Sequence, residues 1–519
     1  MSTVSLTFLL FVAAGLLLYY MAPKKLQWIL LLALSYIFYL SGGVSMTGYL
    51  LFTTLSTFLA ALFIGRQNKR LSDLSREERE KAKKAVGRKK KLVCALAIVL
   101  NFGLLYFLKY WNFMAELFQS AFSVTLVRFD LIMPLAISFY MFQSVGYLVD
   151  VYRDKYPAQK NVFKYMLFVS FFPQMVQGPI GRYDALAPQL LGGHKLDFEN
   201  LKAGIQLMVW GYFKKLLIAD RAAVVANQVF GNYEEYGGTV ILFGVILYCI
   251  QLYCDFSGGI DIIRGVAKLF GIEMAENFRQ PFFAVSLTDF WRRWHISLGT
   301  WMKDYLFYSI SFSKPLMRFG KFSRRKIGGR FGKILPTSIA TFIIYFVIGI
   351  WHGASFKYVA FGLWNGILIT SALLLEPAFI KIKKKLHIRD KNRWYHVFQV
   401  LRTTVIIIIG RYLTRADGFL YAVAMLKKTL LHPIASQIVN GELLRLGLKM
   451  EDYLVIVFGM ALLLFAEVLQ ECGKSLSAVL DRAPSFCQYA VMAMGFICIL
   501  WFGVFSGDYI ASEFIYMQY

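Results

Sequence analysis

The stretch ILPTSIATFIIYFVIGIW (residues 334–351) is an uncharged run of 18 residues, and His352 follows it directly. Because a helix of roughly 20 apolar residues spans the hydrocarbon core of a bilayer, this run predicts a transmembrane helix. An imidazole at the end of such a helix is costly to hold in hydrocarbon unless a polar partner or a water-lined cavity receives it. His352 is therefore the first candidate for a functional residue.

The composition extends this prediction to the whole chain. Of the 519 residues, 58% are hydrophobic and 17% are aromatic, which is far from the composition of a soluble domain. Further uncharged stretches occur at residues 1–23, 26–65, 92–108, 131–149, 236–254, 358–375 and 483–507. The first of these lacks a basic start and a small-residue cleavage site, so we expect it to remain as a helix and not to be removed as a signal peptide. We therefore predict an all-α polytopic membrane protein with a single integral-membrane domain over residues 1–519.

The formal net charge of +26 arises mostly from three short stretches, residues 66–91, 314–333 and 381–393. Because Lys and Arg near span ends favour the cytoplasmic side, we expect a basic cytoplasmic loop at residues 66–91 and, by alternation, extracytoplasmic N- and C-termini. These basic residues flank apolar spans and lack an aromatic-interleaved groove, so anionic lipid head groups explain them better than a nucleic acid does. The phosphates of a cytosolic acyl-thioester donor are a second candidate partner.

Polar residues interrupt the middle of the chain, residues 165–313, where we expect broken or re-entrant helices that line an internal cavity. Within it, DFWRRWH (residues 289–295) places a carboxylate, two arginines and an imidazole between aromatic rings. One interpretation is an interfacial helix whose tryptophans and arginines lie at head-group level. The other is a polar wall whose arginines bind an anionic group or orient His295.

Two interpretations of His352 are also open. It is either a helix-end imidazole that a backbone carbonyl or water satisfies, or a general base, because a neutral imidazole readily takes a proton from a hydroxyl. No other site competes with it, since the sequence has no glycine-rich phosphate loop, no H-E-x-x-H pair and no G-x-S-x-G elbow. The six cysteines form no C-x-x-C pair, so neither a metal site nor a disulfide framework is predicted.

Six short segments, which follow one another between residues 131 and 355, carry a resemblance to a known family that runs from about Leu6 to Tyr519. They are LIMPLAISFY (131–140), QGPIGRY (177–183), YCDFSG (253–258), DFWRRWHISL (289–298), KDYL (303–306) and WHGAS (351–355). Together they resemble the membrane-bound O-acyltransferase (MBOAT) family, in the bacterial branch that contains alginate O-acetyltransferase and the teichoic-acid D-alanyl transferase. The length and the extended C-terminal portion are more similar to the acetyltransferase members.

The resemblance implies a helical enzyme in which a thin floor separates an outer acceptor vestibule from a cytosolic donor pocket. With the hydropathy pattern it predicts about 11 to 13 transmembrane helices, with re-entrant or interfacial helices around a central funnel or tunnel. His352 matches the family's essential histidine and His295 its second histidine, so both are predicted to be catalytic. No metal and no tightly bound cofactor are expected. The predicted substrate-binding residues are Asp289, Arg292, Arg293, Gln177 and Trp351.

The predicted activity is that of an O-acetyltransferase in the bacterial cytoplasmic membrane. An acetyl group would pass from a cytosolic thioester, expected to be acetyl-CoA, to hydroxyls of a cell-surface polysaccharide, directly or through an extracytoplasmic acetyltransferase partner. His352 would act as general base or acyl relay, and His295 with the two arginines would polarise the thioester or position the donor. Two alternatives remain: a D-alanyl transferase that uses a charged carrier protein to modify teichoic acid, and a transporter or flippase, which broken central segments and intramembrane charges favour.

Overall fold

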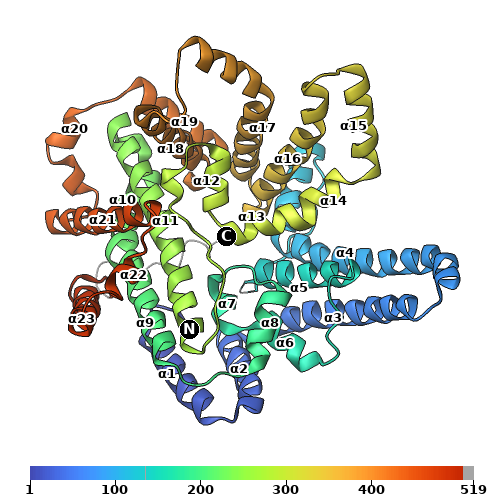
Figure 1. Cartoon of the computed structure of the whole chain (residues 1–519). Helices are drawn as coiled ribbons and strands as arrows, with labels where there is room; N and C mark the ends of the chain where they lie inside the picture. The colour runs from blue at the N-terminus through green and yellow to red at the C-terminus, as the bar shows by residue number, and fades with distance from the viewer. Residues whose placement is uncertain (132, 135, 506–519) are drawn as a thin grey trace. The chain divides into compact units, whose positions relative to one another are not determined.

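The computed structural model describes residues 1–131, 133–134 and 136–505 (Figure 1). Helices dominate this described part of the chain, and its β structure is a single isolated bridge between Phe278 and Trp294. The chain divides into two compact units, residues 1–208 with 259–275, and residues 209–258 with 276 onward. The all-α prediction is confirmed, whereas the single domain over residues 1–519 stays a prediction.

The first unit is built from helices that pack in two groups. They are α1 (Leu6–Met21), α2 (Lys24–Leu40), α3 (Val44–Ser72), α4 (Arg76–Phe122), α5 (Ile137–Tyr152), α6 (Val162–Ser170), α7 (Phe172–Gln177), α8 (Tyr183–Gly192) and most of α9 (Phe198–Tyr212). α3 and α4 lie side by side and pack against α5, whereas α2 packs against α6 and α8.

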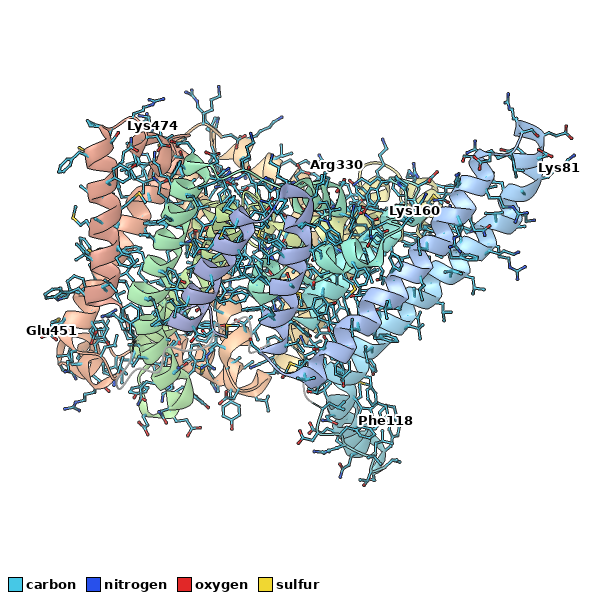
Figure 2. All side chains as sticks on the ribbon, turned by 90° about the horizontal axis from the view of Figure 1, so that it is seen from below. Lys81, Phe118, Lys160, Arg330, Glu451 and Lys474 are labelled. Carbon is cyan, nitrogen blue, oxygen red and sulfur yellow. The ribbon has the colours of Figure 1, made fainter. Side chains whose placement is uncertain are left out.

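The basic segment at residues 66–91, predicted as a loop, is a helical hairpin in the structure. α3 continues to Ser72, and α4 begins at Arg76 after a short turn. The Ser75 hydroxyl accepts a hydrogen bond from the backbone N–H of Glu78, whose carboxylate accepts from the Ser75 N–H, so a capping box starts α4. Figure 2 shows Lys81 at one end of this hairpin and Phe118, near the end of α4, at the other.

The second unit contains the remaining helices. They are η1 (Phe213–Ala219), α10 (Asp220–Gly231), η2 (Tyr233–Glu235), most of α11 (Gly238–Leu269), η3 (Pro281–Phe283), α12 (Leu287–Arg293), α13 (Ile296–Trp301), η4 (Met302–Phe307), α14 (Tyr308–Ser311), α15 (Lys314–Lys326), α16 (Phe331–His352), α17 (Phe356–Lys385), α18 (Arg393–Arg415), α19 (Phe419–Leu431), α20 (Ser436–Val439), η5 (Glu442–Arg445), α21 (Met450–Glu471), α22 (Leu476–Leu480) and α23 (Ser485–Phe502). η1 and η4 are π-helices, which occur often at functional sites.

α16 and α17 form an antiparallel pair that fixes the position of His352 (Figure 1). A Cβ atom on Gly349 would lie only 2.6 Å from the Cα atom of Gly362, so both glycines are needed where the two helices meet. Small residues at such contacts let membrane helices approach closely without a loss of packing. The run at residues 334–351 is helical within α16, as predicted.

Eight helices among the described residues are long and apolar enough to cross a membrane: α3, α4, α11, α16, α17, α18, α21 and α23. α1 is also apolar but is shorter, at 16 residues. The eight candidate spans are fewer than the roughly 11 to 13 transmembrane helices expected from the sequence. In the second unit, Figure 2 places Arg330 and Lys474 at one edge and Glu451 at the other, as the alternation of spans predicts. The predicted position of the C-terminus concerns residues 506–519, which lie outside the described residues.

The middle of the chain is a succession of mostly short helices, as the polar interruptions predict, but α11 is an exception. It runs for 32 residues without a break, through Ser257 and Gly258, in the part of the chain where broken helices were expected. Gly258 serves packing instead, because a Cβ atom there would lie 2.8 Å from the carbonyl oxygen of Gly211. The prediction of a break was therefore wrong, since a glycine in a helix also marks close backbone approach.

Candidate active site

His352 is the last residue of α16, and Gly353 determines what lies beside it. The helix ends because the backbone at Gly353 is extended, with φ 174° and ψ 165°. A Cβ atom on Gly353 would lie 2.4 Å from Cε2 of Tyr358, so only glycine leaves room for that ring. The Tyr358 and His352 rings are 6.2 Å apart, with an interplanar angle of 25°. The edge of the Phe361 ring completes this contact at 5.7 Å.

His295 lies in the turn between α12 and α13, with φ +50° and ψ 53° in the left-handed region. A residue with a Cβ atom adopts that region at a cost of roughly 1–3 kcal/mol, so surrounding contacts must hold it there. Asn277 provides them: its carbonyl accepts from the Ile296 N–H at 3.0 Å, and its Oδ1 accepts from the Ser297 N–H at 2.8 Å. Its Nδ2 lies 3.2 Å from Nδ1 of His295.

These contacts define the protonation of His295. Nδ1 of His295 lies 3.2 Å from Nδ2 of Asn277 and 3.4 Å from its Oδ1; the nearer atom, Nδ2, can only donate, and we assign the ring proton to Nε2 on that basis. His295 lies outside the candidate spans, and only 3% of it is exposed. Burial lowers its pKa from the ordinary value of 6.5 to about 3, with a further decrease from the neighbouring His352. His295 is therefore neutral at physiological pH and can donate a hydrogen bond from Nε2.

Both histidines line one cavity, which lies entirely within the second unit. Its empty volume is about 500 Å³, including the open solvent at its mouth. The Trp351 ring contacts both imidazoles, with ring centroids 6.3 Å from His295 and 5.1 Å from His352. The remaining lining residues come from α11, α12, the turn after α12, α13, α17 and α18, and are Tyr248, Leu252, Phe256, Trp291, Trp294, Leu298, Tyr358, Phe361, Arg411 and Thr414.

The two arginines predicted to bind substrate do not line this cavity. Arg293 forms ion pairs with Glu471 at 2.7 Å and with Asp289 at 3.2 Å. The Asp289 carboxylate also accepts the N–H of Val285, so it stabilises the start of α12. Arg292 is exposed. Trp291 of α12 and Trp294, which directly follows the helix, line the cavity instead.

Gln177 and Trp351, the other two predicted substrate-binding residues, differ in their positions. Trp351 is buried and contacts both histidines. Gln177 ends α7 in the first unit, where its side chain is fully buried and both of its polar atoms lack a hydrogen-bond partner. A buried amide without partners costs free energy, so Gln177 stays a candidate for contact with a polar ligand.

Two residues that the sequence analysis did not single out contribute to the site, Asn277 and Arg411. Asn277 precedes α12 in an irregular segment, and no periodicity marks it as a partner of His295. Arg411 could have been found, because it is a single charged residue in the apolar run TTVIIIIGRYL at residues 403–413. A charge within a membrane helix is a functional candidate by default.

A buried ionic network supports the α11 side of the second unit. Nζ of Lys215 lies 2.6 Å from the carboxylate of Asp255 and 2.9 Å from that of Asp220. Nζ of Lys214 donates to the hydroxyl of Ser257 at 3.0 Å. These contacts join η1 to α11, which in turn supplies cavity residues one and two turns away. Within the described residues, His, Cys, Asp and Glu form no group of three or more that could hold a metal ion.

The fold and the site together define the class: a polytopic all-α membrane protein with two histidines in one cavity. The sequence profile of the membrane-bound O-acyltransferase family matches residues 153–414, which include both histidines, Asn277 and Arg411. The chain belongs to this family, and it is a membrane-bound acyltransferase. The sequence analysis left a transporter or flippase open as an alternative, and the family match identifies an acyltransferase instead.

Similar proteins come from several bacteria. The chain is 31% identical over 406 residues, 77% of its length and 69% of the relative's, to a protein named "Probable alginate O-acetylase" from Pseudomonas syringae. It is 30% identical to the peptidoglycan O-acetyltransferase of Helicobacter pylori, over 57% of this chain and 58% of that protein. It is 26% identical to the teichoic acid D-alanyltransferase of Bacillus subtilis, over 56% of this chain and 70% of that protein.

Proposed function

We propose that this chain is an O-acetyltransferase that moves an acetyl group from a cytosolic thioester to hydroxyls of a cell-surface polysaccharide. The observation that carries the proposal is the cavity that His352 and His295 share. The relatives at 30% and 31% identity are named for the acetylation of peptidoglycan and alginate, which supports both the acetyl group and a polysaccharide acceptor. The D-alanyltransferase relative is less similar, at 26% identity.

In the proposed mechanism His352 acts as the general base. Its imidazole takes the proton of the acceptor hydroxyl as the oxygen attacks the acyl carbonyl carbon. The C–S bond then breaks, and the leaving thiolate takes that proton from the imidazolium. In a covalent relay His352 would accept the acyl group first, and a trapped acyl-enzyme would distinguish this route from direct transfer.

His295 has the complementary role of a hydrogen-bond donor. Because Asn277 occupies Nδ1 and burial keeps the ring neutral, the proton on Nε2 is available to polarise the acyl carbonyl. The two imidazoles therefore have different roles: His352 accepts a proton, and His295 donates a hydrogen bond.

Acetyl-CoA is the proposed donor, and a basic helix supports this choice. α15 has six Lys or Arg residues and no acidic residue among its 13 residues. Such a helix suits the phosphates of a coenzyme on the cytoplasmic side of the bacterial cytoplasmic membrane. On the opposite side, an extracytoplasmic acetyltransferase partner is proposed to pass the acetyl group to the polysaccharide.

The test uses the purified full-length chain in lipid nanodiscs with radiolabelled acetyl-CoA and surface glycan from the source cell. His352→Ala should lower the rate of acetyl transfer by about 10²- to 10⁴-fold, which is the usual contribution of a general base. His295→Ala should lower it less, because a donor is lost but the base remains. His396→Ala is the matched control, since this histidine is exposed in the first turns of α18.

The outcomes separate the competing functions. Acetyl transfer by the wild type that persists in His352→Ala would remove His352 as the base. Transfer that requires a D-alanyl carrier protein and ignores acetyl-CoA would replace acetylation with D-alanylation. Release of CoA by the chain, with acetylated glycan formed only after the extracytoplasmic partner is added, would support the partner step.

A further inference from the structure

Arg411 is a buried cation inside a membrane-spanning segment. It lies near the end of α18, a candidate span, and only 5% of its surface is exposed. It lines the same cavity as His295 and His352. Burying a charge at such a position costs on the order of several kcal/mol. A buried guanidinium in a membrane helix is therefore expected to have a functional role.

The contacts of Arg411 leave its charge uncompensated. Its Cζ atom lies 5.1 Å from the centre of the Trp294 ring, in a cation–π contact, and its side chain hydrogen-bonds the thiol of Cys249, which carries no compensating charge. Its Nε is buried and has no hydrogen-bond partner. Over the described residues, no carboxylate forms an ion pair with Arg411.

Three other arginines of the second unit differ from Arg411, because each is paired with a carboxylate. Arg221 pairs with Asp452 at 3.0 Å, and Arg293 pairs with Glu471 at 2.7 Å. Arg330 pairs with Glu376. Arg411 alone among these four combines burial with an Nε donor that has no partner, the absence of a paired carboxylate among the described residues and a position on the cavity.

We propose that Arg411 is a catalytic residue that stabilises the negative charge on the acyl carbonyl oxygen during transfer. This inference rests on the proposed function. As the acceptor oxygen forms its bond to the carbonyl carbon, the π electrons of C=O move to the oxygen, and the guanidinium donates hydrogen bonds to that oxyanion. When the carbonyl re-forms, the electron pair of the C–S bond leaves with the thiolate, and the charge on the oxygen disappears.

The position of Trp294 explains why a cation is tolerated before substrate arrives. The face of an indole ring attracts a guanidinium, and this holds the side chain in place without neutralising its charge. Since Trp294 directly precedes His295, the same turn that positions His295 also positions Arg411. A full ion pair with a carboxylate would hold the guanidinium more tightly but would compete with the oxyanion.

The test compares Arg411→Met and Arg411→Lys with the wild type in the nanodisc acetyl-transfer assay. Removal of one oxyanion donor typically lowers kcat by about 100- to 1000-fold, and we expect this loss in Arg411→Met with little change in the KM for acetyl-CoA. Arg411→Lys should retain more activity because it keeps the charge but loses the planar fork of donors. Arg402→Met is the matched control on the same helix, since Arg402 is exposed, donates to the Val285 carbonyl, lies against the Phe398 ring and does not line the cavity.

A rescue experiment separates catalysis from support of the fold. Guanidinium ion added to Arg411→Ala should restore part of kcat, with saturation, and should leave Arg402→Met unchanged. A kcat within about threefold of wild type in Arg411→Met, or a loss confined to KM, would overturn the inference. If the wild type itself transfers no acetyl group, the proposed function fails instead, so the two failures are distinguishable.

Discussion

Gly353→Ala tests whether the Tyr358 ring positions His352. The added methyl carbon would stand 2.4 Å from Cε2 and 2.6 Å from Cδ2 of Tyr358. Because carbon atoms in contact need about 3.5 Å, the ring must move by roughly 1 Å. A displacement of that size in an active site can cost about 100-fold, so we expect kcat for acetyl transfer to fall by about 10- to 100-fold. The backbone at Gly353 is extended, so the effect is steric and not conformational.

The measurement is the steady-state rate of acetyl transfer in nanodiscs, with kcat and KM determined separately. Gly299→Ala is the control, because a Cβ atom there meets only the Trp291 carbonyl at 3.6 Å, an ordinary contact. The double variant with Tyr358→Leu should recover part of the lost rate relative to Gly353→Ala, since a shorter side chain leaves room for the methyl group. A kcat for Gly353→Ala within about threefold of wild type would refute this role of Tyr358.

Two further predictions concern stability in detergent. Because burial lowers the pKa of His295 from 6.5 to about 3, the unfolded chain binds a proton between these values that the folded chain excludes, so acid destabilises the fold. The difference in unfolding free energy between the wild type and His295→Gln should be constant above pH 6.5. Below pH 6.5 the wild type should lose stability relative to the variant, by at most about 1.4 kcal/mol per pH unit. A difference that stays constant down to about pH 4.5 would contradict the buried neutral ring. Asp255→Asn should cost about 3–5 kcal/mol, because it leaves part of the Lys215 charge unpaired in the interior. Glu376→Gln, which breaks an exposed pair with Arg330, should change stability by about 0–1 kcal/mol, and equal effects of the two variants would show that the network is not a stabilising unit.

The local sequence was sufficient to predict α16 and the histidine at its end. An uncharged run of 18 residues must form its backbone hydrogen bonds internally in a membrane, so residues 334–351 had to be helical. The same run placed His352 at a helix end, and the structure has α16 end there. The order of six short segments predicted the family, which the profile match over residues 153–414 confirms.

The surroundings of the histidines were not accessible from local patterns. His295 has Asn277 as its partner, 18 residues away across an irregular segment, and no helical or strand period links the two. The sequence did not show that Trp291 and Trp294 line the cavity whereas the adjacent Arg292 and Arg293 do not. A helix of seven residues has too few turns to show a periodic face.

The sequence by itself determined which segments enter the membrane and that an imidazole lies at the end of one of them, because hydrophobic length and backbone hydrogen bonding are local properties. Only the tertiary structure decided which charges meet. It paired Arg293 with Glu471, 178 residues away, and left Arg411 in the cavity with an aromatic ring and no acid, because ion pairing depends on the packing of distant helices. The packing of α12 against α18 brings Arg411 to the Trp294 ring, whereas Arg293 reaches the carboxylate at the end of α21.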